Sequence, residues 1–253
     1  MGEGNRWFHL LTSLKDVLHK GFHAVLRLLY PPRCLVCGSL SEEVLCRGCF
    51  AQLKFIKPPM CDLCGKPYDE LAHAAPICSD CRNTKRWFDR CRCAVRYEGV
   101  AREMIHKFKY GGERRLASEM ARLMVGILND FPLQIELVIP VPLHSKRLRE
   151  RGFNQSELIA ELLSEQVNVP MNSSLLIRIR ETKPQFDLEP RERLNNVRGA
   201  FELVEASAVT GKVVLIVDDV MTVGATLNEC ARALRKGKPR AVYAAAFARA
   251  VGM

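Results

Sequence analysis

The sequence predicts an α/β protein whose parallel sheet is preceded by an N-terminal helix and a small metal-binding segment. Beyond residue 136, continuous apolar runs of strand length alternate with helical patterns, which is typical of a parallel sheet with helices on both faces. Eight cysteines form four C-x-x-C pairs between residues 34 and 81, which is typical of zinc ligands. We therefore expect a helix over 1–30, a double zinc ribbon over 31–85 and the α/β domain over 86–253.

The composition and charge limit the kinds of protein this chain can be and the kinds of partner it can bind. A chain of 253 residues with 48% hydrophobic and 26% charged residues can bury a core, which excludes a disordered chain. No run of 18 uncharged apolar residues occurs, so no membrane span is expected. The formal charge of +10 points to nucleic acid, phosphorylated metabolites or an anionic membrane surface, with a merely solvated basic surface as the alternative.

The cysteines and the N-terminus predict a cytoplasmic location. Eleven cysteines is an odd number, ten of them lie between Cys34 and Cys93, and no secretory signal precedes them, which argues against a disulfide framework. Residues 5–30 instead read as an amphipathic helix that ends at Pro31-Pro32. We expect its apolar stripe to pack on the protein itself; a membrane-surface or partner-binding helix is the alternative, because Lys15 and Lys20 leave a basic face.

The cysteine spacing predicts two structural zinc sites. A glycine follows the first pair of each set, at Gly38 and Gly65, and permits the tight turn that aims backbone amides at the sulfurs. Sequential pairing is the simplest arrangement, and interleaved pairing stays open because the first inner loop is short. Eight thiolates leave no open coordination position for catalysis. The expected ligands are Cys34, Cys37, Cys46, Cys49, Cys61, Cys64, Cys78 and Cys81.

The α/β region divides into elements by its periodicity. Apolar and basic residues alternate over 90–97, which predicts a strand with one buried face, so Cys91 and Cys93 are expected in the core rather than on a metal. Residues 181–198 are polar and are expected to be a functional loop. The other expected strands are 137–139, 175–179, 213–217 and 241–247, and the expected helices are 100–109, 113–129, 156–165 with Asn154 as N-cap, and 225–236.

The stretch from Val213 to Thr226 predicts a phosphate-and-sugar site. An apolar run leads to Asp218-Asp219, then to a loop of small residues and the start of a helix, at the sheet edge where open α/β proteins bind ligands. Loop amides, threonine hydroxyls and a helix N-terminus suit a phosphate, and two carboxylates suit a sugar diol. The alternative is the metal-holding acid pair of a P-loop protein, which the absence of G-x-x-x-x-G-K-[ST] disfavours.

These residues resemble the ribose 5-phosphate signature of the type I phosphoribosyltransferases, and the wider pattern resembles the ComF family (competence protein F, ComFC-like and GntX-like proteins). The resemblance covers nearly the whole chain after residue 31. One departure is Val223, where the family loop commonly has a second threonine. The motifs that carry the wider resemblance are the cysteine ribbons, Lys107-Phe-Lys-Tyr110-Gly, Pro140-Val-Pro142-Leu, Arg151-Gly-Phe-Asn154-Gln155 and Arg180-x4-Gln185.

The resemblance implies roles for individual residues. Asp218 and Asp219 would bind the ribose hydroxyls of 5-phosphoribosyl 1-pyrophosphate (PRPP), and together with Arg151 and Gln185 they are the catalytic candidates. The 5-phosphate would lie on the loop formed by Thr222, Val223, Gly224, Ala225 and Thr226. Lys146, Arg147 and Arg151, in the loop after Pro140, would face the pyrophosphate, and Gln185 and Arg191 would belong to a flexible cover over 181–198.

The resemblance also implies a function and partners. It implies a protein that binds PRPP with Mg2+ and serves natural transformation, handling incoming single-stranded DNA with a DNA-uptake helicase and DNA-processing proteins. Transfer of the phosphoribosyl group to an acceptor stays open, since residues 98–115 outline no nucleobase pocket. The alternative is a non-catalytic PRPP-sensing regulator or a nucleic-acid-binding adaptor.

Overall fold

The computed structural model describes residues 30–68, 76–182, 192 and 195–251. It divides into two compact units, Met1–Phe50 and Ala51–Met253, which are described here separately. The helix expected over 5–30 lies outside the described residues except for its end, so it stays a prediction, as does the division at residues 30 and 85. Among the described residues, no helix has the length and apolar character needed to span a membrane.

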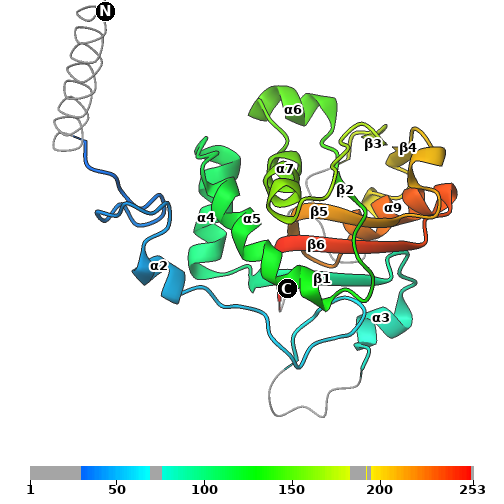
Figure 1. The fold of residues 1–253 in the computed structure, drawn as a ribbon, viewed down its shortest axis with the longest axis horizontal. Coiled ribbons are helices and arrows are strands. Elements are labelled where there is room, and N and C mark those ends of the chain that lie inside the picture. The colour runs from blue at the N-terminus through cyan, green and yellow to red at the C-terminus, as the bar shows by residue number, and fades with distance from the viewer. Residues whose placement is uncertain (1–29, 69–75, 183–191, 193–194, 252–253) are drawn as a thin grey trace, which may run out of the picture. The chain divides into compact units, whose positions relative to one another are not determined.

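The larger unit is built on a four-stranded parallel sheet (Figure 1). Its order is β1 (Arg90–Arg96), β6 (Ala241–Arg249), β5 (Val213–Met221) and β2 (Leu137–Pro140). Every residue of β6 and all but one residue of β5 are buried, as expected for central strands with continuous apolar runs. The predicted parallel sheet is therefore confirmed, and its four carboxyl ends meet at one edge.

Both faces of the sheet are covered. Val214 and Ile216 of β5 share an apolar core with Leu227 of helix α9 (Ala225–Leu234), so the alternate residues of the strand point to the opposite face. That opposite face carries α5 (Leu116–Val125) and α7 (Gln155–Val167), with α4 (Gly99–Tyr110) beside α5. A separate antiparallel pair, β3 (Leu176–Arg178) and β4 (Phe201–Leu203), packs on α9.

The other short elements of the described residues are α2 (Arg47–Ala51), α3 (Ser79–Asn83), α6 (Ser145–Arg151) and the 3-10 helices Gly126–Asp130, Ser207–Val209 and Arg235–Gly237.

Helix α7 begins where the sequence predicts it. The Asn154 side chain accepts a hydrogen bond from Ser156 N at 3.2 Å and so caps the first turn. The same side chain donates to the carbonyl of Val141 at 3.1 Å, which fixes the start of α7 beside the carboxyl end of β2. The N-cap therefore also positions the helix on the sheet edge.

The prediction of one buried face for the strand at 90–97 is wrong. Arg92, which the alternation places in solvent, is 5% exposed. The cause is that residues 54–63 run along the free edge of β1, where Cys91 N donates to Leu63 O at 2.8 Å. The Arg92 guanidinium donates to Asp62 O of this segment at 3.0 Å and pairs with Asp130 at 3.2 Å. A buried arginine is tolerated because its donors are satisfied.

Two further boundaries differ from the sequence prediction. Strand β5 does not end at Val217 but continues through the two aspartates to Met221, so the carboxylates lie within the strand rather than after it. The segment after Pro140 contains the helix α6, where a loop was expected. Five of its seven residues are charged and only Leu148 is apolar, so it has no apolar periodicity by which a helix could be recognised.

Candidate functional site

The two aspartates of β5 are buried near the carboxyl edge of the sheet, and each has its own partner. Asp218 is 9% exposed and Asp219 is 6% exposed. Asp218 Oδ1 accepts hydrogen bonds from Ser156 Oγ at 2.8 Å and from Asp219 N at 2.9 Å. Asp219 Oδ2 lies 2.6 Å from Lys109 Nζ. The first turn of α7 and the last turn of α4 therefore supply the groups that satisfy the pair.

These surroundings shift the pKa values of Asp218 and Lys109. Burial raises the pKa of Asp218 to about 7, and the negative charge of Asp219 adds to the rise. Burial alone would lower the pKa of Lys109, but the attraction of Asp219 outweighs it, so the pKa of Lys109 is raised. Asp219 and Lys109 thus form an ion pair, while Asp218 can hold or release a proton near neutral pH.

The loop after β5 has the shape of an anion site. Gly224 is the N-cap of α9 with a φ of +77°, a left-handed conformation that favours glycine, and it has no side chain to cap the helix amides. A Cβ at Gly224 would lie 2.5 Å from Met221 Cε, so the loop is folded closely over the end of β5. The first turn of a helix has amides without intrahelical partners, and here it lies at the position where the family resemblance places a phosphate. Thr222, Val223 and Thr226 are partly exposed here and Ala225 is buried.

The Arg151-Gly-Phe-Asn154-Gln155 motif forms the turn between α6 and α7. Arg151 Nη1 donates to Gln155 Oε1 at 2.9 Å, and its guanidinium lies 5.2 Å from the ring centre of Tyr110 at the end of α4. Arg151 is also close enough to Lys109 to repel its charge. The motif therefore places a cation beside the Lys109–Asp219 pair.

The structure brings some of the predicted residues together and separates others. Asp218, Asp219, Arg151 and the loop from Thr222 to Thr226 gather at one edge, whereas Gln185 and Arg191 lie outside the described residues. Lys146 pairs with Glu181 at 3.0 Å and Arg147 with Glu150 at 4.0 Å. The assigned roles of all these residues stay predictions.

Sequence reasoning missed the partners of the two acids. Lys109 was visible only as part of the Lys107-Phe-Lys-Tyr110 motif, without a role, and Ser156 carried no signal apart from its place after Asn154-Gln155. Arg178 of β3 was missed as well, although it is close enough for the charge of Asp218 to act on it. These residues come from three different elements, and only the fold brings them to Asp218 and Asp219.

The cysteines form two groups by sequential pairing, so the interleaved alternative is excluded. In each group, all sulfur atoms lie within 4.8 Å of one another. Sulfur–sulfur distances of 3.8 Å for Cys34–Cys49 and 3.7 Å for Cys64–Cys78 match the edge of about 3.8 Å of a tetrahedron with zinc–sulfur bonds of about 2.3 Å. The donor sets thus fit zinc. The groups are Cys34, Cys37, Cys46 and Cys49, and Cys61, Cys64, Cys78 and Cys81.

The two groups differ in exposure. In the first, Cys37 is exposed and Cys46 is partly exposed, whereas all four cysteines of the second are buried in the core of the larger unit. Backbone amides point at sulfurs in both, for example Cys46 N to Cys34 Sγ at 3.4 Å and Cys78 N to Cys61 Sγ at 3.4 Å. Cys91 and Cys93 belong to neither group and lie in the core as predicted.

Comparison with known proteins agrees with this architecture. The double zinc ribbon domain matches residues 25–82, and the phosphoribosyl transferase domain matches residues 154–251. Competence protein F of Haemophilus influenzae is 32% identical over 173 residues, which are 66% of this chain and 76% of that protein. The chain belongs to the ComF family. Its type I phosphoribosyltransferase-like sheet and its cysteine ribbons are the two parts of that family's architecture found here.

Two further members of the ComF family show the same level of similarity. The DNA utilization protein YhgH of Escherichia coli K12 is 31% identical over 175 residues, 67% of this chain and 76% of that protein. Competence protein ComFC of Bacillus subtilis is 30% identical over 188 residues, 67% of this chain and 75% of that protein. The chain thus spans about three quarters of each relative.

The first testable consequence concerns Asp218. Because its pKa is raised in the folded protein, the folded state holds the proton more tightly, and wild-type stability falls as pH rises from about 4 to about 7. Asp218→Asn removes this cost, so we expect it to be more stable than wild type at pH 8 by roughly 2–4 kcal/mol, with the gain fading toward pH 4. Denaturant titrations across this range measure the difference.

Asp219→Asn is the matched control, because it leaves the partly buried Lys109 without its partner and should lower stability instead. An Asp218→Asn variant with the same pH dependence as wild type would show that the buried carboxyl does not titrate in this range.

The second consequence concerns zinc. We expect about two zinc ions per chain by mass spectrometry of the purified protein, one for each four-cysteine group. Cys37→Ser and Cys64→Ser should each lower the content to about one, and Cys64→Ser should cost more stability because its group lies in the core. Cys91→Ser, a buried cysteine outside both groups, should keep two ions; loss of zinc in that variant would contradict the assignment.

Proposed function

We propose that this chain binds PRPP with Mg2+ at the carboxyl edge of its sheet and serves the use of incoming DNA. The observation that supports this most directly is the buried Asp218-Asp219 pair followed at once by the Gly224-capped helix. Adjacent acids are suited to accept hydrogen bonds from the two ribose hydroxyls, and the amides of the loop that follows them are suited to the 5-phosphate. The relatives named competence and DNA utilization proteins supply the DNA context.

The partners of the acids suit this role. Lys109 pairs with Asp219 through Oδ2 at 2.6 Å, and a carboxylate paired through one oxygen still has acceptor positions for a hydroxyl. Ser156 occupies Oδ1 of Asp218 and leaves Oδ2 for the diol. Arg151 and Lys109 supply positive charge for the pyrophosphate, and Mg2+ would enter with that group, since it retains water and needs few protein ligands.

If transfer occurs, a nucleophile forms a bond to C1 of the ribose while the bond from C1 to the pyrophosphate oxygen breaks, and pyrophosphate leaves with the electron pair. The chain contributes positioning and charge stabilisation. The alternative is a regulator that binds PRPP without turnover. Acceptor-dependent release of pyrophosphate distinguishes the two, and single-stranded DNA is one of the acceptors to be tried.

Single-stranded DNA binding is supported by the exposed cations around the site. Arg114 lies 4.6 Å from the ring centre of Phe153 and joins the start of α5 to the turn before α7, while Lys146 and Arg149 of α6 are exposed. Tyr110 is 59% exposed in the same region and offers a ring on which a base can stack. We propose a cytoplasmic role beside a DNA-uptake helicase and DNA-processing proteins.

PRPP binding is tested by calorimetry with Mg2+ present. Asp219→Asn and Asp218→Asn each remove a charged acceptor for a ribose hydroxyl, so we expect the dissociation constant for PRPP to rise tenfold or more. Glu136→Gln is the control, because this carboxylate accepts from Val213 N at 2.8 Å at the other end of the same strand. Absence of binding heat in wild type, or equal affinity in all four proteins, refutes the proposal.

DNA binding is tested by the salt dependence of affinity for a single-stranded oligonucleotide. Each phosphate contact contributes about −0.7 to the slope of log affinity against log salt. Lys146→Gln and Arg149→Gln should each flatten the slope by nearly one contact. Arg240→Gln, an exposed cation at the amino end of β6, should leave it unchanged. An affinity insensitive to salt would show that phosphate contacts are not responsible.

A further inference from the structure

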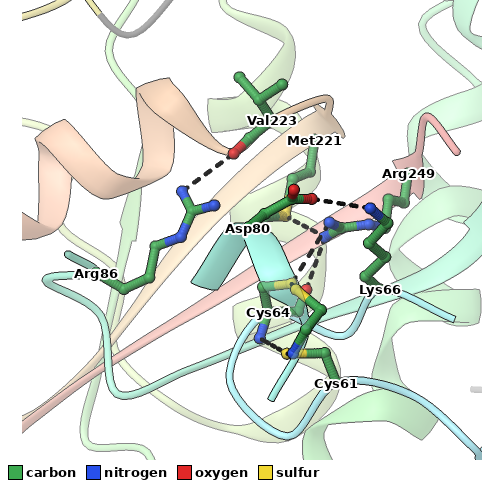
Figure 2. Close-up of polar contacts among 9 residues, drawn as sticks. Cys61, Cys64, Lys66, Asp80, Arg86, Met221, Val223 and Arg249 are labelled. Carbon is green, nitrogen blue, oxygen red and sulfur yellow. Dashed lines mark hydrogen bonds and ion pairs between the residues drawn. The ribbon is translucent and has the colours of Figure 1, made fainter. Parts of the chain in front are cut away.

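The second cysteine group is joined to the end of β5 by a buried arginine (Figure 2). Arg249, the last residue of β6, is 4% exposed. Its Nη1 donates to Cys64 O at 2.7 Å and its Nη2 to Cys64 Sγ at 3.5 Å. The same Nη1 lies 3.1 Å from Met221 Sδ. One guanidinium thus contacts both a zinc ligand and the residue immediately before the loop at Thr222.

A second arginine lies between the second cysteine group and the loop. Arg86 Nη1 donates to Val223 O at 3.1 Å, as Figure 2 shows, and its side chain lies near the Cys81 thiol. The residues on either side of Arg86 hold the start of α9: Asn228 Oδ1 accepts from Trp87 N at 2.7 Å, and Asn228 Nδ2 donates to Lys85 O at 3.2 Å. The segment after α3 therefore contacts the loop and the helix that follows it.

The positive charges of the two arginines balance the negative charge of a zinc ion bound by four thiolates. Four thiolates around Zn2+ carry a net charge of 2−, and Arg86 and Arg249 carry 2+. Arginine donors to metal-bound thiolates are the outer partners that orient ligands and raise the stability of a metal site. Arg249 donates to the Cys64 thiolate and lies against Met221, while Arg86, near Cys81, donates to Val223, so the two cations beside the zinc ligands also support the loop.

The first cysteine group has a different setting. Arg33, its neighbouring arginine, donates to Gly38 O at 2.9 Å, and Cys37 Sγ lies 3.0 Å from Ser39 Oγ. These contacts stay within its own short segment, which belongs to the smaller compact unit. The two groups are chemically alike, but the arginines that contact the loop after β5 lie beside the second group.

We propose that the second zinc ribbon is part of the ligand site, with Arg86 and Arg249 as positioning residues that hold the loop Met221–Gly224 in shape when zinc is bound. Met221 connects Arg249 to the loop. Its sulfur lies beside the Arg249 guanidinium, and its side chain lies against Gly224, where a Cβ would come within 2.5 Å of Met221 Cε. The inference rests on the proposed function only in naming PRPP as the ligand. The link between the ribbon and the loop does not depend on it.

The test compares Arg86→Met and Arg249→Met with wild type. In the free, zinc-loaded protein we expect amide hydrogen exchange over residues 221–226 to rise tenfold or more, because each variant removes one support of the loop. The dissociation constant for PRPP should rise by a similar factor. Unchanged exchange in both variants overturns the inference.

Arg92→Met is the matched control. Arg92 is as buried as Arg249 and also holds the second ribbon, through Asp62 O at 3.0 Å, but its hydrogen bonds go to that segment, to Cys91 O and to Asp130 rather than to the loop. We expect a loss of stability with loop exchange and PRPP affinity within about twofold of wild type. Equal effects of Arg92→Met and Arg249→Met on the loop would show general destabilisation and overturn the inference.

A reciprocal measurement avoids variants altogether. Coupling between two sites acts equally in both directions, so PRPP should protect the second group from chelator-driven alkylation several-fold and leave the first group unprotected. Peptide mapping distinguishes Cys61–Cys81 from Cys34–Cys49. Equal protection of both groups, or of neither when calorimetry shows binding, overturns the inference. If wild type binds no PRPP, the proposed function fails, and the exchange comparison still decides the link between ribbon and loop.

Discussion

Two neighbouring carboxylates buried within one strand are the constraint on which the rest of the larger unit depends. Burying a charge is unfavourable unless it is paired and hydrogen bonded. The ends of two helices meet this requirement, since α4 brings Lys109 to Asp219 and α7 brings Ser156 to Asp218. The parallel order of the sheet places both helix ends at the edge where the loop Thr222–Thr226 begins. A costly polar pair at such an edge is more easily understood as a binding feature than as a source of stability.

The second cysteine group belongs structurally with this edge. A cysteine-rich segment with few apolar residues cannot form a core of its own, and here its four ligands share the core that contains Val214 and Ile216 of β5. The same segment runs along the free edge of β1 and supplies the hydrogen-bond acceptor Cys64 O for Arg249. The ComF architecture in this chain therefore has one ribbon built into the phosphoribosyltransferase-like unit and one in a separate compact unit.

Local patterns predicted the sheet, most helices, the N-cap at Asn154 and the eight zinc ligands, because continuous apolar runs and C-x-x-C spacing are properties of short segments. The burial of Arg92 and the Lys109–Asp219 pair could not be predicted in this way. Each depends on contact between segments far apart in the chain, and Lys109 and Asp219 are separated by 110 positions. Helix α6 escaped prediction for a different reason, since a charged surface helix has no apolar stripe. The roles of Gln185 and Arg191 remain predictions.

A crystal structure of the zinc-loaded protein with PRPP and Mg2+ tests the central claim most directly. The account predicts the two ribose hydroxyls within hydrogen-bonding distance of the Asp218 and Asp219 carboxylates, and the 5-phosphate on the amides of residues 222–226. Electron density for PRPP at another place on the chain, with Lys109 and Ser156 still bound to the two acids and no ribose hydroxyl near them, would contradict it.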